Sequence, residues 1–340
     1  MTHILASFAF VFALQSGQPA TDAPAPTGVD QMVQEAAAMQ PLVQSALARA
    51  YLSAIACLPR IASPRTVYYN KEARDAMTVA QFQALAEAQR AGYEETEIPE
   101  QFFYYTRYGT PVAFVRPLEI LGHAGVKSAD GLKIVDFGFG TIGQLRALAS
   151  LGADANGVEV DPLLKAVYSD PGDTGSVPRC DAAGAGGQGG VKLVFGQFPA
   201  DGAVSEAVGG GYDVFISKNT LKRGYIHPEH EVNPKLLVQL RVDDETFVRA
   251  VYDALKPGGF ALIYNLCTAP AEAGKPYIPW ADGRSPFPRE LFERVGFAVV
   301  AFDNDDTAAA REMGKTLGWG DSMDLTKDLF GTYTLVRKPQ

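Results

Sequence analysis

Two acidic residues, Asp136 and Glu159, flank a glycine pattern in the stretch KIVDFGFGTIGQLRALASLGADANGVEVDP (133–162). Gly138, Gly140 and Gly143 form a GxGxxG motif between an apolar run and a helical pattern. In that context glycines let the backbone approach a ligand closely, and the amino end of a helix favours negative charge. The glycines alone fit a dinucleotide, and a tight strand-to-helix turn without a ligand is the structural alternative.

Asp136 changes this interpretation because it stands two residues before Gly138. A carboxylate there would repel a pyrophosphate but would attract an ammonium group. The motif therefore favours a ligand with an aminoacyl end over a nicotinamide dinucleotide. Glu159 stands at the end of the next apolar run, where a second polar contact to the same ligand is expected.

A parallel sheet is needed to bring these residues together. Beyond Lys133, short apolar runs alternate with helical patterns, which indicates an α/β fold with a mostly parallel sheet and helices on both faces. Ligands of such sheets bind at the carboxyl ends of the strands, so the site is expected just after each run. The expected strands are KIVDFGF (133–139), ANGVEV (155–160), VKLVFG (191–196), YDVFISK (212–218) and GFALIYNLC (259–267).

From Pro117 to Lys338 the chain resembles the class I S-adenosylmethionine-dependent methyltransferases. The resemblance rests on an ordered set of pieces: VDFGFGTIG, GVEVDP, VFGQF, YDVFISKNTL, LKPGGFALIY and ELFERVGFAVV. It implies a Rossmann-like, seven-stranded, mostly parallel sheet whose last strand, GTYTLVRK, is antiparallel. It also implies S-adenosylmethionine as the cofactor.

The resemblance further implies roles for particular residues. Asp136 and the backbone of Gly138 and Gly140 would hold the methionyl end of the cofactor, and Glu159 would bind the ribose hydroxyls.

Gln197 and Phe198 follow the third strand and would lie beside the adenine. The family usually has an acidic residue there, so the sequence departs from the family pattern at this point. A glutamine can still pair with an amide-like edge. Asp161, before Pro162, is expected to cap a helix.

The methyl acceptor is expected in the polar loops after the fourth and fifth strands, at 217–234 and 275–288. Family members that methylate adenine or glutamine often carry a D/N-P-P-Y stretch in the first loop, and SKNT replaces it here. Methyl transfer needs positioning in a dry site more than covalent help from the protein. Candidates for a general base, should one be needed, are His227, Asp282, Tyr225 and Lys218.

The same loops are partly basic. Lys218, Lys222, Arg223 and Arg284 together would suit an anionic small molecule, with a solvated charged face as the alternative. Pro228 disfavours a helical metal pair between His227 and His230, so no metal is expected.

Composition narrows the classes of partner. The 340 residues carry 30 lysines and arginines against 39 aspartates and glutamates, a net charge of −9 that disfavours a nucleic-acid substrate. The three cysteines, Cys57, Cys180 and Cys267, are far apart, show no CxxC or zinc spacing, and are expected to be isolated thiols.

The amino terminus suggests export. Residues 4–14, ILASFAFVFAL, have the length of a signal-peptide core and are too short to cross a bilayer. We interpret 1–23 as a signal peptide of a periplasmic or secreted protein, although no Lys or Arg precedes the run. A misassigned start and a cytoplasmic protein, or a buried amino-terminal helix, are the alternatives.

Residues 24–121 are expected to form a linker and a helical cap, and residues 122–340 the methyltransferase-like domain. The cap is rich in aromatic residues, with VYYN (67–70) and QFFYYTRYGTP (101–111) as packing faces or as cover for a ligand.

These observations predict methyl transfer from S-adenosylmethionine to an unidentified small molecule. Export creates a conflict because this cofactor is a cytosolic metabolite. An exported, non-catalytic ligand-binding protein on the same fold is therefore kept as an alternative, and so, less favoured, is a nicotinamide-dependent oxidoreductase.

Overall fold

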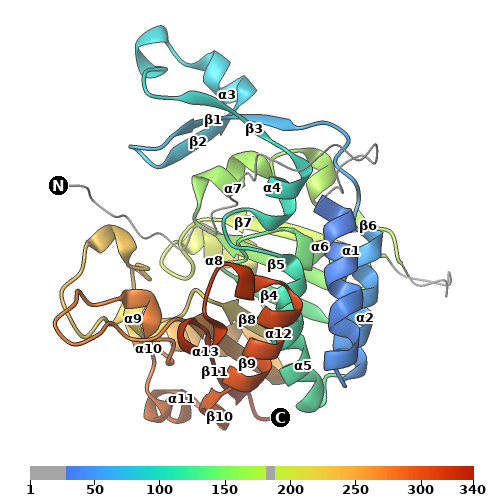
Figure 1. Ribbon diagram of the computed structural model, residues 1–340, viewed down its shortest axis with the longest axis vertical. Helices are drawn as coiled ribbons and strands as arrows, with labels where there is room; N and C mark the ends of the chain where they lie inside the picture. The colour runs from blue at the N-terminus through green and yellow to red at the C-terminus, as the bar shows by residue number, and fades with distance from the viewer. Residues whose placement is uncertain (1–27, 181–187) are drawn as a thin grey trace.

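A large twisted sheet runs through the centre of the protein (Figure 1). The computed structural model describes residues 28–180 and 188–340. The predicted signal peptide therefore lies outside the described residues.

The large sheet has eight strands in the order β10-β11-β9-β8-β4-β5-β7-β6. Strands β7, β5, β4, β8 and β9 are parallel, and β11 is antiparallel to both of its neighbours. The expected seven-stranded sheet with an antiparallel last strand is thus confirmed. The short β6 adds an eighth strand because it pairs antiparallel with β7. The strands are β4 (Lys133–Phe137), β5 (Asp154–Glu159), β6 (Gly175–Val177), β7 (Gly189–Phe195), β8 (Tyr212–Lys218), β9 (Leu255–Cys267), β10 (Ala298–Asp305) and β11 (Phe330–Arg337).

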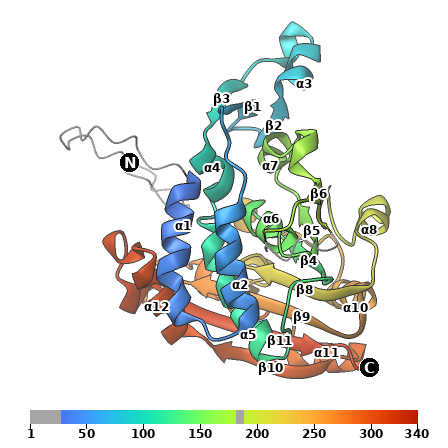
Figure 2. The ribbon, with the colours of Figure 1, turned by 90° about the vertical axis from the view of Figure 1, so that its right-hand side faces the viewer.

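Helices cover both faces of the sheet (Figure 2). Alternate residues of a strand point to opposite faces of the sheet. On β4, Ile134 packs in the apolar cluster that includes the amino-terminal helices, whereas Val135 packs in the cluster that includes Phe247 of α10. The helices after β4 are α6 (Gly143–Ala149), α7 (Pro162–Val167), α8 (Gly202–Val208), α9 (Arg223–Ile226), α10 (Asp244–Ala254), α11 (Arg289–Val295), α12 (Thr307–Thr316) and α13 (Leu325–Asp328).

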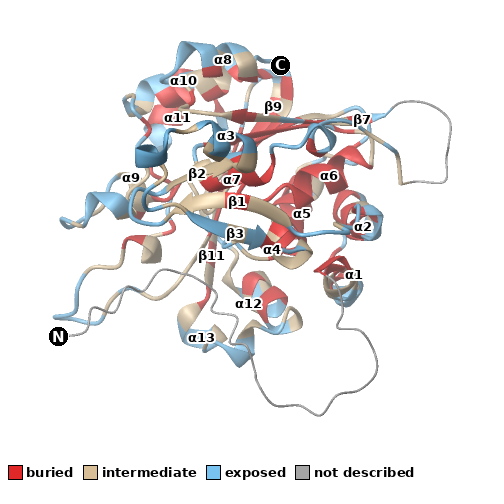
Figure 3. Ribbon diagram, turned by 90° about the horizontal axis from the view of Figure 1, so that it is seen from above, coloured by how far each residue is buried: buried red, intermediate tan, exposed pale blue. Residues whose placement is uncertain are grey.

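The amino-terminal region is less helical than expected. Helices α1 (Gly28–Met39) and α2 (Ala46–Ala54) agree with the expected helical cap and pack beside the large sheet. A three-stranded antiparallel sheet then follows, formed by β1 (Arg65–Asn70), β2 (Asp75–Thr78) and β3 (Glu94–Ile98). It projects from the rest of the molecule together with α3 (Val79–Ala84) (Figure 1), and its strands β1 and β2 are half-buried whereas β3 is mostly exposed (Figure 3).

Cross-strand contacts explain this small sheet. Tyr68 lies opposite Glu95 and donates a hydrogen bond of 2.8 Å to its carboxylate, and its ring stacks on Phe82 of α3 at 3.6 Å. Thr78 caps α3, and that helix ends at Ala84. The helical interpretation of this part of the cap was therefore wrong, because strand pairing decided its structure.

Two more helices lead into the large sheet: α4 (Glu100–Tyr105) and α5 (Val115–His123). The expected domain boundary at residue 121 falls inside α5, which packs against both α2 and β9.

The prediction of isolated thiols was wrong for Cys57 and Cys180 and is confirmed for Cys267. Cys57 and Cys180 form a disulfide with their Cα atoms 5.8 Å apart, and Cys267 is a free, partly buried thiol. The bond joins the end of the α2 region to the loop after β6. A sequence separation of 123 residues hid the pair, since only the folded chain brings the two elements together.

Candidate functional site

Asp136 and Lys218 lie at the point where the strand order reverses. Asp136 on β4 pairs with Ile216 on β8, so Lys218, two residues further along β8, projects from the same face of the sheet. The carboxyl ends of β4 and β8 form the switch point at which open α/β sheets bind ligands. Glu159 ends β5 on the other side of β4.

Asp136 is almost fully buried, at 1% exposure. Its Oδ2 atom accepts a hydrogen bond of 3.0 Å from Nε2 of Gln144, whereas its Oδ1 atom has no hydrogen-bond donor within residues 28–180 and 188–340. Burial raises the pKa of Asp136 to about 7, against the opposing effects of the Gln144 hydrogen bond and the Lys218 charge. Asp136 is therefore a buried carboxyl group with one oxygen that has no protein partner, and a cationic donor at that oxygen would favour its charged form.

Gln144 was not predicted. It lies in the first turn of α6, is 3% exposed, and also donates 2.6 Å to the carbonyl oxygen of Phe139. Its Oε1 atom is buried and, among the described residues, has no hydrogen-bond partner. A glutamine directly after the glycine motif carries no signal in the sequence, because its contact with Asp136 depends on how α6 packs on β4.

Gly138 and Gly140 both adopt positive φ, at 73° and 63°. Thr220, after β8, packs against Gly138, and the ring of Tyr108 lies over Gly140, where an added Cβ would come within 3.1 Å of the ring. Thr106 also donates 3.0 Å to the carbonyl oxygen of Gly140. Side chains from the amino-terminal region and from the β8 loop thus cover the glycine loop.

Glu159 is tied to the same loop. Its Oε2 atom accepts from the Gly140 N–H at 3.3 Å, and its Oε1 atom accepts from the N–H groups of Val160 and Asp161 at 2.7 and 3.3 Å. Burial raises the pKa of Glu159. Glu159 is therefore held against the glycine loop by backbone N–H groups, and its contact with a ligand stays a prediction.

The aromatic segment before α5 divides into two parts. Tyr104 and Tyr105 are both buried. The Tyr104 hydroxyl donates a hydrogen bond of 2.6 Å to the Pro59 carbonyl, and the Tyr105 hydroxyl donates one of 2.9 Å to the Glu35 carboxylate. Tyr108 is 48% exposed and, with Arg107, reaches Asp161. Asp161 also caps α7, as predicted. Tyr104 and Tyr105 pack the scaffold, whereas Tyr108 covers the site.

Gln197 and Phe198 follow β7, the neighbour of β5. Phe198 is buried and packs against Phe137 and Phe247 in the core, and Gln197 is partly exposed. The contact of both residues with an adenine stays a prediction.

The four candidate bases have different surroundings. The ring of His227 is exposed and pairs with Asp244 of α10 at 2.9 Å. Asp282 forms an ion pair of 2.7 Å with Arg284. Burial acts to raise the pKa of Asp282, but the contacts with Arg284 hold that pKa below its usual value.

Tyr225 and Lys218 are the other two. Burial raises the pKa of Tyr225 to about 12 and lowers that of Lys218 to about 8. Of the four candidates, Lys218 is the one whose charge acts on Asp136.

The predicted basic cluster is divided as well. Arg223 and Arg284 form ion pairs with Glu229 and Asp282 at the surface. Lys222 is buried, donates to the Leu266 carbonyl at 2.5 Å, and has its pKa lowered to about 8 by burial.

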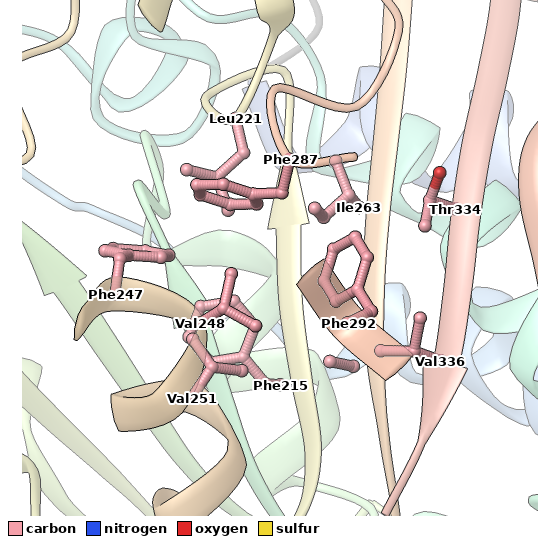
Figure 4. A pocket seen from close by; sticks show the side chains of 11 residues that line it. Phe215, Leu221, Phe247, Val248, Val251, Ile263, Phe287, Phe292, Thr334 and Val336 are labelled. Carbon is pink, nitrogen blue, oxygen red and sulfur yellow. The ribbon is translucent and has the colours of Figure 1, made fainter. Parts of the chain in front are cut away.

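Other features lie away from this edge. A cavity of about 10 Å³ between the sheet, α10 and α11 is lined by apolar side chains and by Thr334, and it holds at most one water (Figure 4). In the described part of the chain, no three metal-ligating side chains gather, and no helix has the length and apolarity to span a membrane.

No protein-family model matches the chain, and no curated protein matches it. Similar solved structures include phosphoethanolamine N-methyltransferase 2 from Haemonchus contortus, with 15% identity over 83% of this chain and 71% of that chain and a TM-score of 0.41. A second is an S-adenosylmethionine-dependent methyltransferase from Mesorhizobium loti, with 17% identity over 64% of this chain and 95% of that chain and a TM-score of 0.36. A third is a TehB-like S-adenosylmethionine-dependent methyltransferase from Corynebacterium glutamicum, with 17% identity over 68% of this chain and 98% of that chain and a TM-score of 0.31.

The likeness to these structures is distant, and the sheet itself defines the fold. Its strands β7-β5-β4-β8-β9 follow the doubly wound Rossmann order 3-2-1-4-5, and the antiparallel β11 completes the arrangement that the sequence resemblance implies. The protein has the Rossmann-like fold of class I methyltransferases.

Proposed function

We propose that the protein transfers a methyl group from S-adenosylmethionine to a small-molecule acceptor. One observation carries the proposal: a buried carboxylate with an unpaired oxygen, Asp136, precedes the glycine loop at the switch point of a methyltransferase-type sheet. A carboxylate there suits the ammonium of an aminoacyl ligand and opposes the pyrophosphate of a nicotinamide dinucleotide.

The residues at this edge fit the cofactor. Asp136 would hold its ammonium, the close backbone at Gly138 and Gly140 would take the methionyl chain, and Glu159 would accept from the ribose hydroxyls. Gln197 would lie near the adenine. When bound, S-adenosylmethionine supplies an electrophilic methyl group on a sulfonium centre.

Lys218 is the base candidate that fits this site best. It ends β8 at the switch point, and its pKa of about 8 leaves a useful neutral fraction near neutral pH. The neutral amine could take a proton from the acceptor as the methyl group is transferred. His227, Tyr225 and Asp282 are weaker candidates, because His227 is hydrogen-bonded to Asp244, Asp282 is engaged in an ion pair with Arg284, and Tyr225 keeps its proton.

We also propose that the acceptor is a small molecule with anionic character. Lys222 supports this, since its side chain is buried, its charge interacts unfavourably with that of Lys218, and its one hydrogen-bond acceptor within the described residues is a backbone carbonyl. A buried cation without a carboxylate partner is costly, and an anionic group would offset that cost.

Ligand binding without methyl transfer is the second candidate function. It is favoured by the contacts of Tyr108 and Thr220 over Gly140 and Gly138, which fill space next to the loop. It would also remove the conflict between export and a cytosolic cofactor.

Calorimetric titration of the purified protein with S-adenosylmethionine, S-adenosylhomocysteine and NAD tests the proposal. Binding of S-adenosylmethionine and S-adenosylhomocysteine, together with no binding of NAD, supports the proposal. Binding of NAD alone would support the oxidoreductase, and binding of S-adenosylmethionine with no turnover of any offered acceptor would favour the binding protein.

A further inference from the structure

Gln144 and Asp136 form one hydrogen-bonded unit with two free acceptor atoms. Nε2 of Gln144 donates to Oδ2 of Asp136, and Oδ1 of Asp136 and Oε1 of Gln144 are both buried without a partner in the described part of the chain. The two side chains are 1% and 3% exposed. Buried acceptors without donors are rare in folded proteins and destabilise them.

The orientation of the amide is fixed by its surroundings. Nε2 of Gln144 has two acceptors, Oδ2 of Asp136 at 3.0 Å and the Phe139 carbonyl at 2.6 Å. Turning the amide would place Oε1 against both oxygens, so the amide oxygen is the free atom. Phe139 lies within the glycine motif, so Gln144 links Asp136 to the loop that approaches the ligand.

A primary ammonium group matches this pair of acceptors. It carries three N–H donors and a positive charge, whereas a hydroxyl carries one donor and no charge. The charged and titratable groups around Asp136 are Lys218 from β8, Glu159 from β5 and Tyr51 from α2. The Oδ1 atom accepts no hydrogen bond from Lys218. Its acceptor capacity is therefore open to a ligand donor.

We infer that Gln144 is a specificity-determining residue which, with Asp136, binds the primary ammonium group of an aminoacyl ligand. This inference rests on the proposed function, in which that ligand is the cofactor. Gln144 would then distinguish ligands that carry the amino group from ligands that lack it, and it would have no effect on recognition of the nucleoside.

The test compares two ligands on the full protein: S-adenosylhomocysteine and its analogue that lacks only the α-amino group. The ratio of their dissociation constants is measured by calorimetry for the wild type and for Gln144→Met, which keeps length and removes both polar atoms. We expect the preference for the amino ligand to fall by at least about tenfold, the usual effect of losing a hydrogen bond to a charged group.

Two further variants separate recognition from structure. A protonated glutamate offers one donor and one acceptor, so Gln144→Glu should keep the ratio within about threefold of the wild type. Gln197→Met should weaken both ligands alike and leave the ratio unchanged. If Gln144→Met fails to fold, Gln144→Asn, which withdraws the acceptor by one methylene group, replaces it with the same expected loss.

An unchanged ratio in a folded Gln144→Met protein that still binds S-adenosylhomocysteine would overturn this inference alone. Failure of the wild type to bind S-adenosylhomocysteine would overturn the proposed function, and the inference with it.

Discussion

Asp136 illustrates at the residue scale how a binding site lowers the stability of its own fold. The folded protein keeps the proton of this buried carboxyl up to about pH 7, whereas the unfolded chain loses it near pH 4. Between these values unfolding releases a proton, so the raised pKa makes the wild type less stable as the pH rises.

Replacing the carboxyl by an amide should therefore stabilise the protein. For Asp136→Asn we expect a free energy of unfolding above that of the wild type by on the order of 2 kcal/mol at pH 7.5. The difference should shrink as the pH falls to 4.5. Urea denaturation at the two pH values checks this, and a difference that does not depend on pH would contradict the assignment of a raised pKa to Asp136.

Some site residues could be predicted from the sequence and others could not. One local pattern of strand, loop and helix contains Asp136, Gly138, Gly140 and Glu159. The types and spacing of these residues therefore predict that they lie close together in the fold. The role of Gln144 depends on the packing of α6 on β4, which no spacing describes.

At the scale of elements, the segment before α5 is the cover of the site. Tyr108 packs over Gly140 and is half exposed, whereas Tyr105 is buried and bonded to Glu35. Cofactor affinity and stability should therefore depend on different tyrosines.

We expect Tyr108→Ala to weaken binding of S-adenosylhomocysteine by about 1 kcal/mol, the contribution of an aromatic cover, with little change in melting temperature. Tyr105→Phe is the matched control and should lower stability by about 1 kcal/mol without changing affinity. Equal affinity of Tyr108→Ala and the wild type would make the segment scaffold, and the acceptor site would then be sought in the loops after β8 and β9.

The strands of the large sheet could be predicted because apolar runs that are buried on both faces stand out in a sequence. YDVFISK (212–218) coincides with β8. The small sheet β1-β2-β3 could not be predicted from the sequence, because its strands are half-buried or exposed. They are stabilised by partners such as Glu95 and Phe82, which lie farther along the chain.

At the scale of the whole molecule, the Cys57–Cys180 disulfide joins the amino-terminal helices to the outer edge of the sheet. A bond that closes so long a loop restricts the unfolded chain strongly. The loop also contains β1 to β6, so the bond spans both the small sheet and the glycine loop.

We expect Cys57→Ser to lower the free energy of unfolding by about 2–5 kcal/mol. A reductant should destabilise the wild type similarly and leave this variant unaffected. Cys267→Ser, which keeps the disulfide, is the control. Unfolding curves of the wild type that coincide with and without reductant would show that the bond does not form.

Disulfides persist in oxidising compartments, so the same bond supports the proposed export. We predict that the mature protein begins between Gln18 and Pro24, after the apolar run of residues 4–14. Amino-terminal sequencing of native material checks this. An intact Met1 or Thr2 would reverse the proposal and remove the conflict with a cytosolic cofactor.

The most direct test of the central claim is the affinity of S-adenosylhomocysteine for the wild type, Asp136→Ala and Glu159→Ala. Each variant removes one carboxylate proposed to accept hydrogen bonds from the cofactor, and each should weaken binding by about 1.5–3 kcal/mol. Wild-type affinity in both variants would contradict the proposal that these carboxylates at the carboxyl edge of the sheet hold the cofactor.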